Sequence, residues 1–289
     1  MARDACGWPA SFSKRSKPEE TVMNHEPSAC RLDGKVAIIT GASRGIGLTL
    51  ARAFAQAGCA VMLAARDPKR LARAGQELEQ SSSQVAAYGC DVAEPQQVEA
   101  MVQETVERFG TVDILINNAG VLGPIGSAWE ADTDAWRRAI DVNLLGTYLC
   151  CKAVLPIMIR QRRGKIINLS GRGAHEAWPN FSAYGVSKTA VVRLTETLAA
   201  ETKPFNVQIN VMAPGANDTE LFRQAAEHEP SMLADLPTDP DQPARLALFL
   251  ASERSDHITG RFIHVNQDWM TWTAEDLPEG RYTLRRAAR

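Results

Sequence analysis

The chain has 289 residues, of which 45% are hydrophobic, so one α/β domain with extensions can enclose a continuous core. Its 32 basic and 34 acidic side chains leave a formal charge of −2, which argues against a global attraction to nucleic acid or to an anionic membrane. We therefore expect neither nucleic acid nor membrane among its partners.

The cysteines and histidines do not indicate a metal site. Six cysteines are scattered without CxxC or Cys/His ligand spacing, and the five histidines show no metal spacing either. Reduced thiols and no metal are predicted. The first twenty residues lack the apolar run of a secretory signal, and no stretch of about 18 apolar residues predicts a membrane span. These patterns predict a soluble, cytoplasmic protein.

Residues 1–31 are rich in Ser, Pro and charge and show no sustained periodicity, so they are predicted to be a disordered extension. Met23 lies just ahead of the folded pattern, which leaves open whether residues 1–22 matter for function. At the other end, residues 268–289 contain Trp269 and Trp272, which predict an ordered tail. Two roles for this tail are open, namely packing at a subunit interface and forming a lid over the substrate.

From Lys35 onward, short apolar runs alternate with segments of helical spacing. The run "KVAIIT" is followed by "GLTLARAFAQAG" and by a second apolar run, "AVMLAAR", which together form one βαβ unit. Runs without polar alternation are typical of strands covered on both faces. The pattern predicts a single-domain, doubly wound parallel sheet in a three-layer α/β/α fold over residues 32–267. Later helices are expected near 69–80, 95–109, 132–161, 182–202 and 242–252.

The segment Thr40–Gly47, "TGASRGIG", lies between the first strand and the first helix. Glycines there permit a tight turn and a close approach of backbone amides to a pyrophosphate, and the helix N-terminus adds a favourable partial charge. Three glycines alone are weak evidence, but their place in the first βα turn predicts dinucleotide binding.

The end of the second strand predicts which nicotinamide cofactor is used. An acidic residue there would bond the ribose 2′-hydroxyl and repel a 2′-phosphate, but the sequence has Ala65 followed by Arg66. Arg44 supplies a second guanidinium, and guanidinium groups suit phosphate recognition. We therefore predict NADP(H). Asp67 leaves two alternatives open, because it can pair with Arg66 or bond the ribose.

Two later strands end in polar residues, at the sheet edge where parallel sheets bind ligands. Asp91 and Val92 follow one strand and are predicted to contact the adenine. The sequence "NNAG", Asn117–Gly120, follows another. Asn117 also has a purely structural interpretation, because short amides commonly fix a strand-end turn by bonding the backbone.

In the sequence "YGVSK", Lys188 follows Tyr184 by four residues in a helical stretch, so the two side chains share one face. A nearby ammonium favours the phenolate form of a tyrosine, whose ordinary pKa is about 10, as does the positive ring of an oxidised nicotinamide. The pair is therefore predicted to work as a general acid/base.

These motifs, in this order and spacing, resemble the short-chain dehydrogenase/reductase family in its form of roughly 250 residues. The match runs from about Gly34 to Asn266 and includes "TGASRGIG", "NNAG", "DVNLLG", "YGVSK", "APGANDT" and "SDHITGRFIHVN". The resemblance implies a Rossmann-type fold and NAD(P)-linked hydride transfer at a small-molecule carbonyl or alcohol. It also implies a homodimer or homotetramer that uses the helices near 132–161 and 182–202.

Carried over to this sequence, the resemblance assigns roles to single residues. Tyr184 is the proton donor and acceptor, and Lys188 holds the nicotinamide ribose and lowers the tyrosine pKa. Asn143 kinks its helix and anchors a water that relays protons. The predicted catalytic residues are Tyr184, Lys188, Asn143 and Ser170. The residues predicted to bind cofactor are Gly41, Ser43, Arg44, Gly45, Ile46, Gly47, Arg66, Asp91, Val92, Asn118, Ala119, Gly120, Tyr184, Lys188, Pro214, Gly215 and Thr219.

The sequence departs from the family at the serine that orients the substrate. That serine normally lies 13 residues before the tyrosine, where this chain has Gly171, and Ser170 lies one residue earlier. Neighbouring side chains of an extended strand point to opposite faces, so in a regular strand Ser170 faces away from the substrate. Three outcomes are open: a local bulge turns Ser170 inward, another donor such as His175 or Asn180 replaces it, or catalysis is lost.

The leading hypothesis from the sequence is an NADP(H)-dependent oxidoreductase acting on a ketone or aldehyde. The rival, motivated by Gly171, is a catalytically weak NADP(H)-binding sensor or scaffold. Trp178 and Phe181, beside the tyrosine, are candidates for lining an apolar substrate site or for core packing. No motif identifies the substrate.

Overall fold

A computed structural model describes residues 30–80, 84–236, 239–278 and 280–284. The disordered extension predicted for residues 1–31 therefore falls almost entirely outside the described residues. The seven strands are β1 (Val36–Thr40), β2 (Ala60–Ala65), β3 (Val85–Gly89), β4 (Ile114–Asn117), β5 (Gly164–Leu169), β6 (Val207–Ala213) and β7 (Phe262–His264).

All strand pairs are parallel, and the strand order is β3-β2-β1-β4-β5-β6-β7. The order reverses at β1, which pairs with both β2 and β4, and ligands of open parallel sheets bind at such a switch point. The predicted doubly wound fold is confirmed. The polar segments that follow β1, β2, β3, β4, β5 and β6 thus meet along one edge of the sheet.

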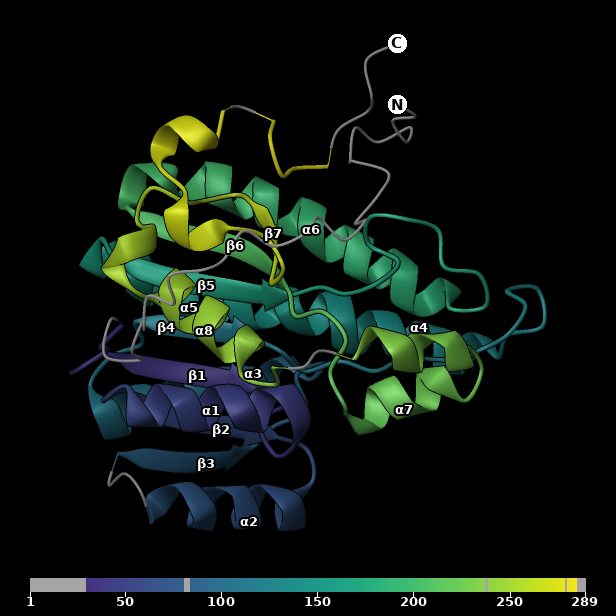
Figure 1. Cartoon of the computed structure of the whole chain (residues 1–289). Helices are drawn as coiled ribbons and strands as arrows, with labels where there is room; N and C mark the ends of the chain where they lie inside the picture. Colours follow the sequence, from purple (N-terminus) through teal and green to yellow (C-terminus); the bar gives the residue numbers. More distant parts are fainter. Residues whose placement is uncertain (1–29, 81–83, 237–238, 279, 285–289) are drawn as a thin grey trace.

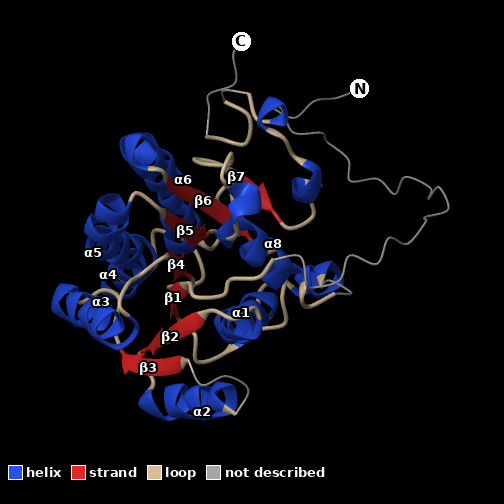
Figure 2. Cartoon of the chain, turned by 90° about the vertical axis from the view of Figure 1, so that its left-hand side faces the viewer, coloured by secondary structure: helices blue, strands red, loops and turns tan. Residues whose placement is uncertain are grey.

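Helices cover both faces of the sheet (Figure 2). The helices are α1 (Gly45–Gln56), α2 (Pro68–Glu79), α3 (Pro95–Phe109), α4 (Thr133–Ile140), α5 (Gly146–Gln161), α6 (Ser182–Thr202), α7 (Glu220–Ala226) and α8 (Gln242–Ala251). Short 3-10 turns are η3 (Lys203–Phe205), η4 (Pro230–Asp235), η5 (Glu253–Ser255), η6 (Trp269–Thr271) and η7 (Ala274–Asp276). The sequence predicted the helices near 95–109 and 182–202 at their observed bounds and did not predict α7.

The alternation of side chains along each strand divides the core into two layers. In β1, Ala37 and Ile39 pack with α1, α2 and α8, whereas Ile38 packs with α3, α5 and α6 on the other face. Every residue of β1 and β2 is buried, which explains why these strands read as unbroken apolar runs. None of the five described cysteines forms a disulfide.

Residues 133–161 form one continuous helix with a π-helical turn, η2 (Asp141–Leu145), between α4 and α5. This helix is long and apolar enough, by length and composition alone, to cross a membrane, which the sequence analysis did not recognise. Half of its most apolar window is buried inside the protein. Its exposed apolar side chains include Tyr148. The use of this helix in a homodimer or homotetramer stays a prediction.

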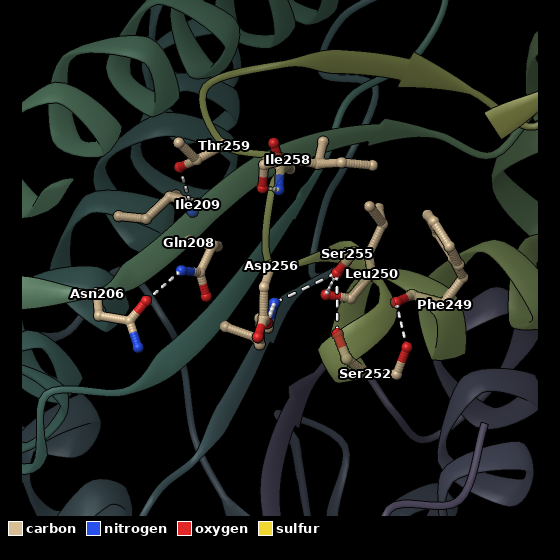
Figure 3. A network of polar contacts seen from close by, with 12 residues as sticks. Asn206, Gln208, Ile209, Phe249, Leu250, Ser252, Ser255, Asp256, Ile258 and Thr259 are labelled. Carbon is tan, nitrogen blue, oxygen red and sulfur yellow. Dashed lines mark hydrogen bonds and ion pairs between the residues drawn. The ribbon is translucent and has the colours of Figure 1, made fainter. Parts of the chain in front are cut away.

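β7 is the edge strand opposite β3, and the tail follows it. Figure 3 shows how polar contacts hold the turn before β7 in place: Thr259 accepts from the Ile209 amide of β6 (3.2 Å), and the Ser255 hydroxyl donates to the Leu250 carbonyl of α8 (2.9 Å). Beyond β7, Trp269 is buried against Phe249 of α8, with their ring centroids 5.1 Å apart.

The described end of the tail lies beside β7 and α6 (Figure 1). The Phe262 amide of β7 donates to the Tyr282 carbonyl (2.8 Å), and the Leu284 amide donates to Glu196 of α6 (2.6 Å). The tail thus has fixed contacts through Leu284.

Candidate functional site

The glycine turn between β1 and α1 is held by steric fit as well as by backbone conformation. Gly41 has φ +65°, and a Cβ there would lie 2.8 Å from Asn118 Nδ2; a Cβ on Gly47 would lie 2.4 Å from both Asn118 Nδ2 and the Gly41 carbonyl oxygen. Side chains are therefore excluded at both positions. The Arg44 side chain does not cap α1, so the first amides of this helix are available to an anion.

The segment after β4 is tied to the end of β1. The Thr40 hydroxyl accepts from the amides of Asn118 (3.0 Å) and Ala119 (3.1 Å), and Asn118 Nδ2 donates to the Thr40 carbonyl (2.8 Å). Asn117 is buried and donates to the Asn168 side chain of β5 (2.8 Å), so it is held by a side chain and not by the backbone bond that its structural interpretation assumed; Asn118 makes the backbone bonds instead.

Tyr184 and Lys188 lie on one face of α6, and both side chains are buried. The Lys188 ammonium is 5.7 Å from the centroid of the Tyr184 ring and donates to the Leu169 carbonyl at the end of β5 (2.9 Å). Helical spacing places the two groups together as the sequence predicted.

Burial acts against the predicted lowering of the tyrosine pKa, and the effect of an oxidised nicotinamide ring on that pKa stays a prediction. Burial raises the pKa of Tyr184 to about 12, because it disfavours the charged phenolate. Burial likewise lowers the pKa of Lys188 to about 8, because it disfavours the ammonium. Spacing along a helix gives the distance between the two groups but not the cost of removing each from water.

Asn143 connects the π-helical turn to the loop after β4 and to α6. Its Oδ1 accepts from the Val121 amide (2.9 Å), and its Nδ2 donates to the Val121 carbonyl and to the Ser187 hydroxyl (2.9 Å each). Ser187 in turn donates to the Tyr184 carbonyl (2.8 Å). The main-chain carbonyl of Asn143 accepts from the Thr147 hydroxyl (2.8 Å). The helix distortion expected at Asn143 is present as the π turn, and the water relay stays a prediction.

Ser187 is a residue that the sequence analysis missed. It lies three residues after Tyr184, so helical spacing already placed it on the face of α6 that carries the tyrosine. Its side chain is fully buried and bonds both Asn143 and the Tyr184 main chain.

The segment after β5 shows what the glycine at position 171 does. A Cβ on Gly171 would lie only 2.5 Å from the Tyr184 hydroxyl oxygen, so that hydroxyl takes the space that a side chain at position 171 would need. The Ser170 hydroxyl donates to the Lys188 carbonyl of α6 (3.2 Å). This contact favours a structural role for Ser170, and its role as a donor to substrate stays a prediction.

The two replacement donors considered from the sequence lie elsewhere. The His175 ring faces Phe262, with centroids 6.3 Å apart, and Asn180 has φ +69° in a turn whose carbonyl accepts from the Gly126 amide (2.8 Å). Neither residue lines the cavity described below.

The strand ends on the other side of the switch point carry a group of arginines. Arg44 pairs with Glu220, and Arg66 lies 3.9 Å from Asp91 Oδ2. The Asp91 carboxylate also pairs with Arg138 of α4, so its predicted contact with adenine competes with two guanidinium groups.

Asp67 caps α2 and pairs with Arg70 rather than with Arg66, and it lines the same cavity as Arg66, so its bond to the ribose stays a prediction. Asp67 Oδ1 accepts from the Lys69 and Arg70 amides (3.0 Å each), and its other oxygen lies 3.4 Å from Arg70 Nε. Because β2 ends at Ala65, Arg66 is the first residue beyond the strand, as predicted.

One cavity of about 670 Å³ collects most of these residues. Its lining includes the predicted residues Gly41, Ser43, Arg44, Gly45, Ile46, Gly47, Arg66, Val92, Asn118, Ala119, Gly120, Ser170, Tyr184, Lys188, Pro214 and Thr219. The predicted residues Asp91, Asn143 and Gly215 do not line it, and no described residue of the tail does. Arg70 and Glu220 line it and were not predicted. A groove of about 880 Å³ between α3 and α5 contains none of the predicted site residues.

An apolar cluster adjoins the Tyr184 end of the cavity. Phe181, which immediately precedes α6, and Tyr184 of α6 pack there with Phe222 of α7 and Met232 of η4. The Trp178 ring stacks on Phe181 at 3.8 Å and meets Tyr184 edge-on at 5.8 Å. Among the residues that the structure describes, no group of His, Cys, Asp or Glu is arranged to hold a metal ion.

Known proteins share this sequence and fold. A family model described as short chain dehydrogenase matches residues 35–230. The 3-oxoacyl-acyl-carrier-protein reductase FabG of Thermotoga maritima is 33% identical over 241 residues, which cover 82% of this chain and 98% of that protein. L-fucose dehydrogenase of Oryctolagus cuniculus is 36% identical over 239 residues, which cover 79% of this chain and 82% of that protein.

Solved structures agree with these relatives. Levodione reductase superposes with a TM-score of 0.77 at 26% identity, covering 81% of this chain and 96% of that one. NAD+-bound xylitol dehydrogenase superposes with a TM-score of 0.76 at 28% identity, covering 80% of this chain and 97% of that one.

The lowered pKa of Lys188 predicts a pH dependence of stability. An amine with a pKa of about 8 when folded and an ordinary value of 10.5 when unfolded destabilises the fold fully below pH 8, and this cost disappears as the pH rises through 10.5. We expect the free energy of unfolding to rise by about 2 kcal/mol between pH 8 and pH 10 through this group. In Lys188→Met this contribution is absent.

Urea unfolding at several pH values measures the difference between the native protein and the variant. Lys152→Met, at an exposed position of α5, serves as control and keeps the rise. An identical pH profile for Lys188→Met and the native protein would show that Lys188 is not desolvated.

Proposed function

The chain belongs to the short-chain dehydrogenase family, and on this basis we propose that it is an NADP(H)-dependent oxidoreductase that interconverts a carbonyl and an alcohol. The observation that carries the proposal is the single cavity in which the glycine turn, Gly120 and the Tyr184–Lys188 pair meet. A dinucleotide lying along the sheet edge would place its reactive end beside a buried acid/base.

The residues at this edge fit a dinucleotide by shape and by charge. Gly41 and Gly47 let the turn pack directly against Asn118, and the first residues of α1, which line the cavity, have no side-chain cap on their amides. When bound, the nicotinamide cofactor supplies the hydride and, once oxidised, a positive ring. The residues of the chain hold the cofactor, orient the substrate and move the proton.

Tyr184 is suited to donate the proton in carbonyl reduction. With its pKa raised to about 12 by burial, the phenol stays protonated at neutral pH and can protonate the oxygen that gains negative charge. Lys188, whose pKa burial lowers to about 8, exchanges protons near neutral pH and can return one to the tyrosine. The bonds from Asn143 through Ser187 to the Tyr184 main chain fix the helix that carries both groups.

Arginines support the choice of NADP(H). Ala65 ends β2 without an acidic side chain, and Arg44, Arg66 and Arg70 line the cavity around that strand end. Guanidinium groups bind phosphate in charge-assisted hydrogen bonds, which a 2′-phosphate offers and a 2′-hydroxyl does not. The family includes enzymes of the other kind, since the solved structure of xylitol dehydrogenase has NAD+ bound.

Gly171 favours the rival function, a sensor or scaffold with weak catalysis. The Ser170 hydroxyl is engaged with α6, and loss of one donor to a reacting oxygen typically slows a reaction about 10²- to 10³-fold. The complete Tyr184, Lys188 and Asn143 network argues for retained chemistry. NADPH consumption with a panel of ketones, aldehydes and sugar-like carbonyls separates the two functions, because binding without turnover throughout supports the rival.

Substitution of Tyr184 by phenylalanine tests the proposed acid/base. Tyr184→Phe removes only the hydroxyl, so NADPH should still bind while turnover falls by about 10²- to 10⁴-fold. Tyr148→Phe, on the exposed side of α5, is the matched control and should leave turnover unchanged. Steady-state assays with NADPH fluorescence titration measure both quantities, and near-native turnover by Tyr184→Phe would refute the mechanism.

Substitution of Gly171 by alanine tests the contact between its backbone and the tyrosine. The added Cβ would displace the Tyr184 hydroxyl, and a misplacement of about 1 Å can cost about 100-fold in turnover. Gly89→Ala is the control, because no atom lies within 4 Å of a Cβ built there. Gly171→Ser should fail to raise turnover for the same reason. A Gly171→Ser variant with higher turnover would contradict this, because it would show that the Tyr184 hydroxyl can move aside without loss of turnover.

Substitution of Arg66 by alanine tests the cofactor. Loss of a charge-assisted bond to the 2′-phosphate should weaken NADPH binding about 10-fold or more and leave NADH binding nearly unchanged. Arg137→Ala is the control, because it removes the same charge on α4, beside Asp134 and outside the cavity, and it should leave the binding of both cofactors unchanged. Calorimetric titration with both cofactors measures the effect, and equal losses for NADPH and NADH would contradict the choice of cofactor.

A further inference from the structure

Glu220 places a carboxylate among the arginines that line the cofactor cavity. It is the first residue of α7, and it pairs with Arg44 of the glycine turn and with Arg70 of α2, the latter at 2.7 Å. Arg44 and Arg70 precede Glu220 by more than a hundred residues in the chain. One carboxylate therefore joins α7 to both segments that surround the end of β2.

A second carboxylate holds the segment after α7. Glu229 lies 3.1 Å from the Arg172 guanidinium and accepts from the Trp178 indole (2.7 Å). Both partners belong to the loop that follows β5 and carries Gly171. Residues 220–229 are thus fastened at one end to the cofactor side of the cavity and at the other end to the substrate side.

The inner face of α7 covers the tyrosine. Phe222, Ala225 and Ala226 are buried in the cluster that contains Phe181 and Tyr184. A substrate that reaches the apolar side of Tyr184 must therefore share or displace this packing. The position of α7 governs access to the reacting group.

The guanidinium groups around Glu220 form a cationic cluster that favours an anion. Arg44, Arg66 and Arg70 line the same cavity, and burial together with the charges of Arg70 and Arg66 lowers the pKa of Arg44, while Asp67 opposes this shift. Asp67 is committed to capping α2. Glu220 comes from a different segment, its side chain is 58% exposed, and the hydroxyl that caps α7 belongs to Thr219 instead.

We propose that Glu220 occupies the place of the cofactor's 2′-phosphate and so holds α7 closed over the cavity. A 2′-phosphorylated cofactor competes with Glu220 for Arg44 and Arg70 and releases the first turn of α7, whereas a cofactor with a free 2′-hydroxyl leaves both ion pairs intact. Glu220 is then a determinant of cofactor specificity that also couples the kind of cofactor to substrate access. This inference rests on the proposed use of NADP(H).

Fragment binding tests the competition. The probes are adenosine 2′,5′-bisphosphate and 5′-AMP, which differ only in the 2′-phosphate, and calorimetry measures their affinities. Glu220→Gln removes the competing charge and should bind the bisphosphate about three- to tenfold more tightly, with 5′-AMP unchanged. Glu227→Gln makes the same charge change at an exposed position just after α7 and should leave both affinities as in the native protein.

Hydrogen exchange tests the release of α7. In the native protein, the bisphosphate should raise amide exchange in residues 220–226 and 5′-AMP should not. In Glu220→Gln, exchange in these residues should be raised without any ligand. Because the Glu220 side chain is exposed, the substitution leaves the buried contacts of α7 in place.

The outcomes separate this inference from the proposed function. If the native protein binds 5′-AMP as tightly as the bisphosphate, the choice of NADP(H) fails and the inference fails with it. If the native protein prefers the bisphosphate but Glu220→Gln shows neither tighter binding nor raised exchange, the cofactor proposal stands and the role of Glu220 is refuted.

Discussion

The hydroxyl of Thr40 ties the segment after β4 to the carboxyl end of β1, beside the β1–β4 pairing that joins the two halves of the sheet. It accepts hydrogen bonds from the amides of Asn118 and Ala119, while the Asn118 side chain donates back to the Thr40 carbonyl. These bonds fix the ends of β1 and β4 where the strand order reverses. The glycine turn packs closely against Asn118, so the hydrogen bonds of Asn118 also fix the position of the turn. The cavity extends from this junction toward the glycine turn on one side and toward Tyr184 and Lys188 on the other.

Much of the fold is readable from the sequence because its causes are local. Helix α6 and helix α3 were predicted at their observed bounds from spacing and flanking residues, and the strands were predicted from unbroken apolar runs. The glycine turn and the Tyr184–Lys188 pair likewise depend on residues close together in the chain. These features need no knowledge of distant contacts.

The features that the sequence did not reveal depend on distant segments. Glu220 meets Arg70 across 150 residues, and no local pattern marks either as a partner of the other. The burial that raises the pKa of Tyr184 was not predicted, because helical spacing reports the nearby ammonium but not the loss of water around the phenol. The count back from Tyr184 identified Gly171 as unusual, but only the folded chain shows that the tyrosine hydroxyl fills the space beside it.

The hydrogen bond from Phe262 to Tyr282 has a meaning beyond the ordering of the tail. β7 is the outermost strand of a parallel sheet, and an open strand edge is a template on which another chain can pair. Here the protein's own tail takes up a main-chain donor of that strand. Tyr282 therefore removes one main-chain donor from the outer edge of β7, which leaves one fewer group there to pair with another chain.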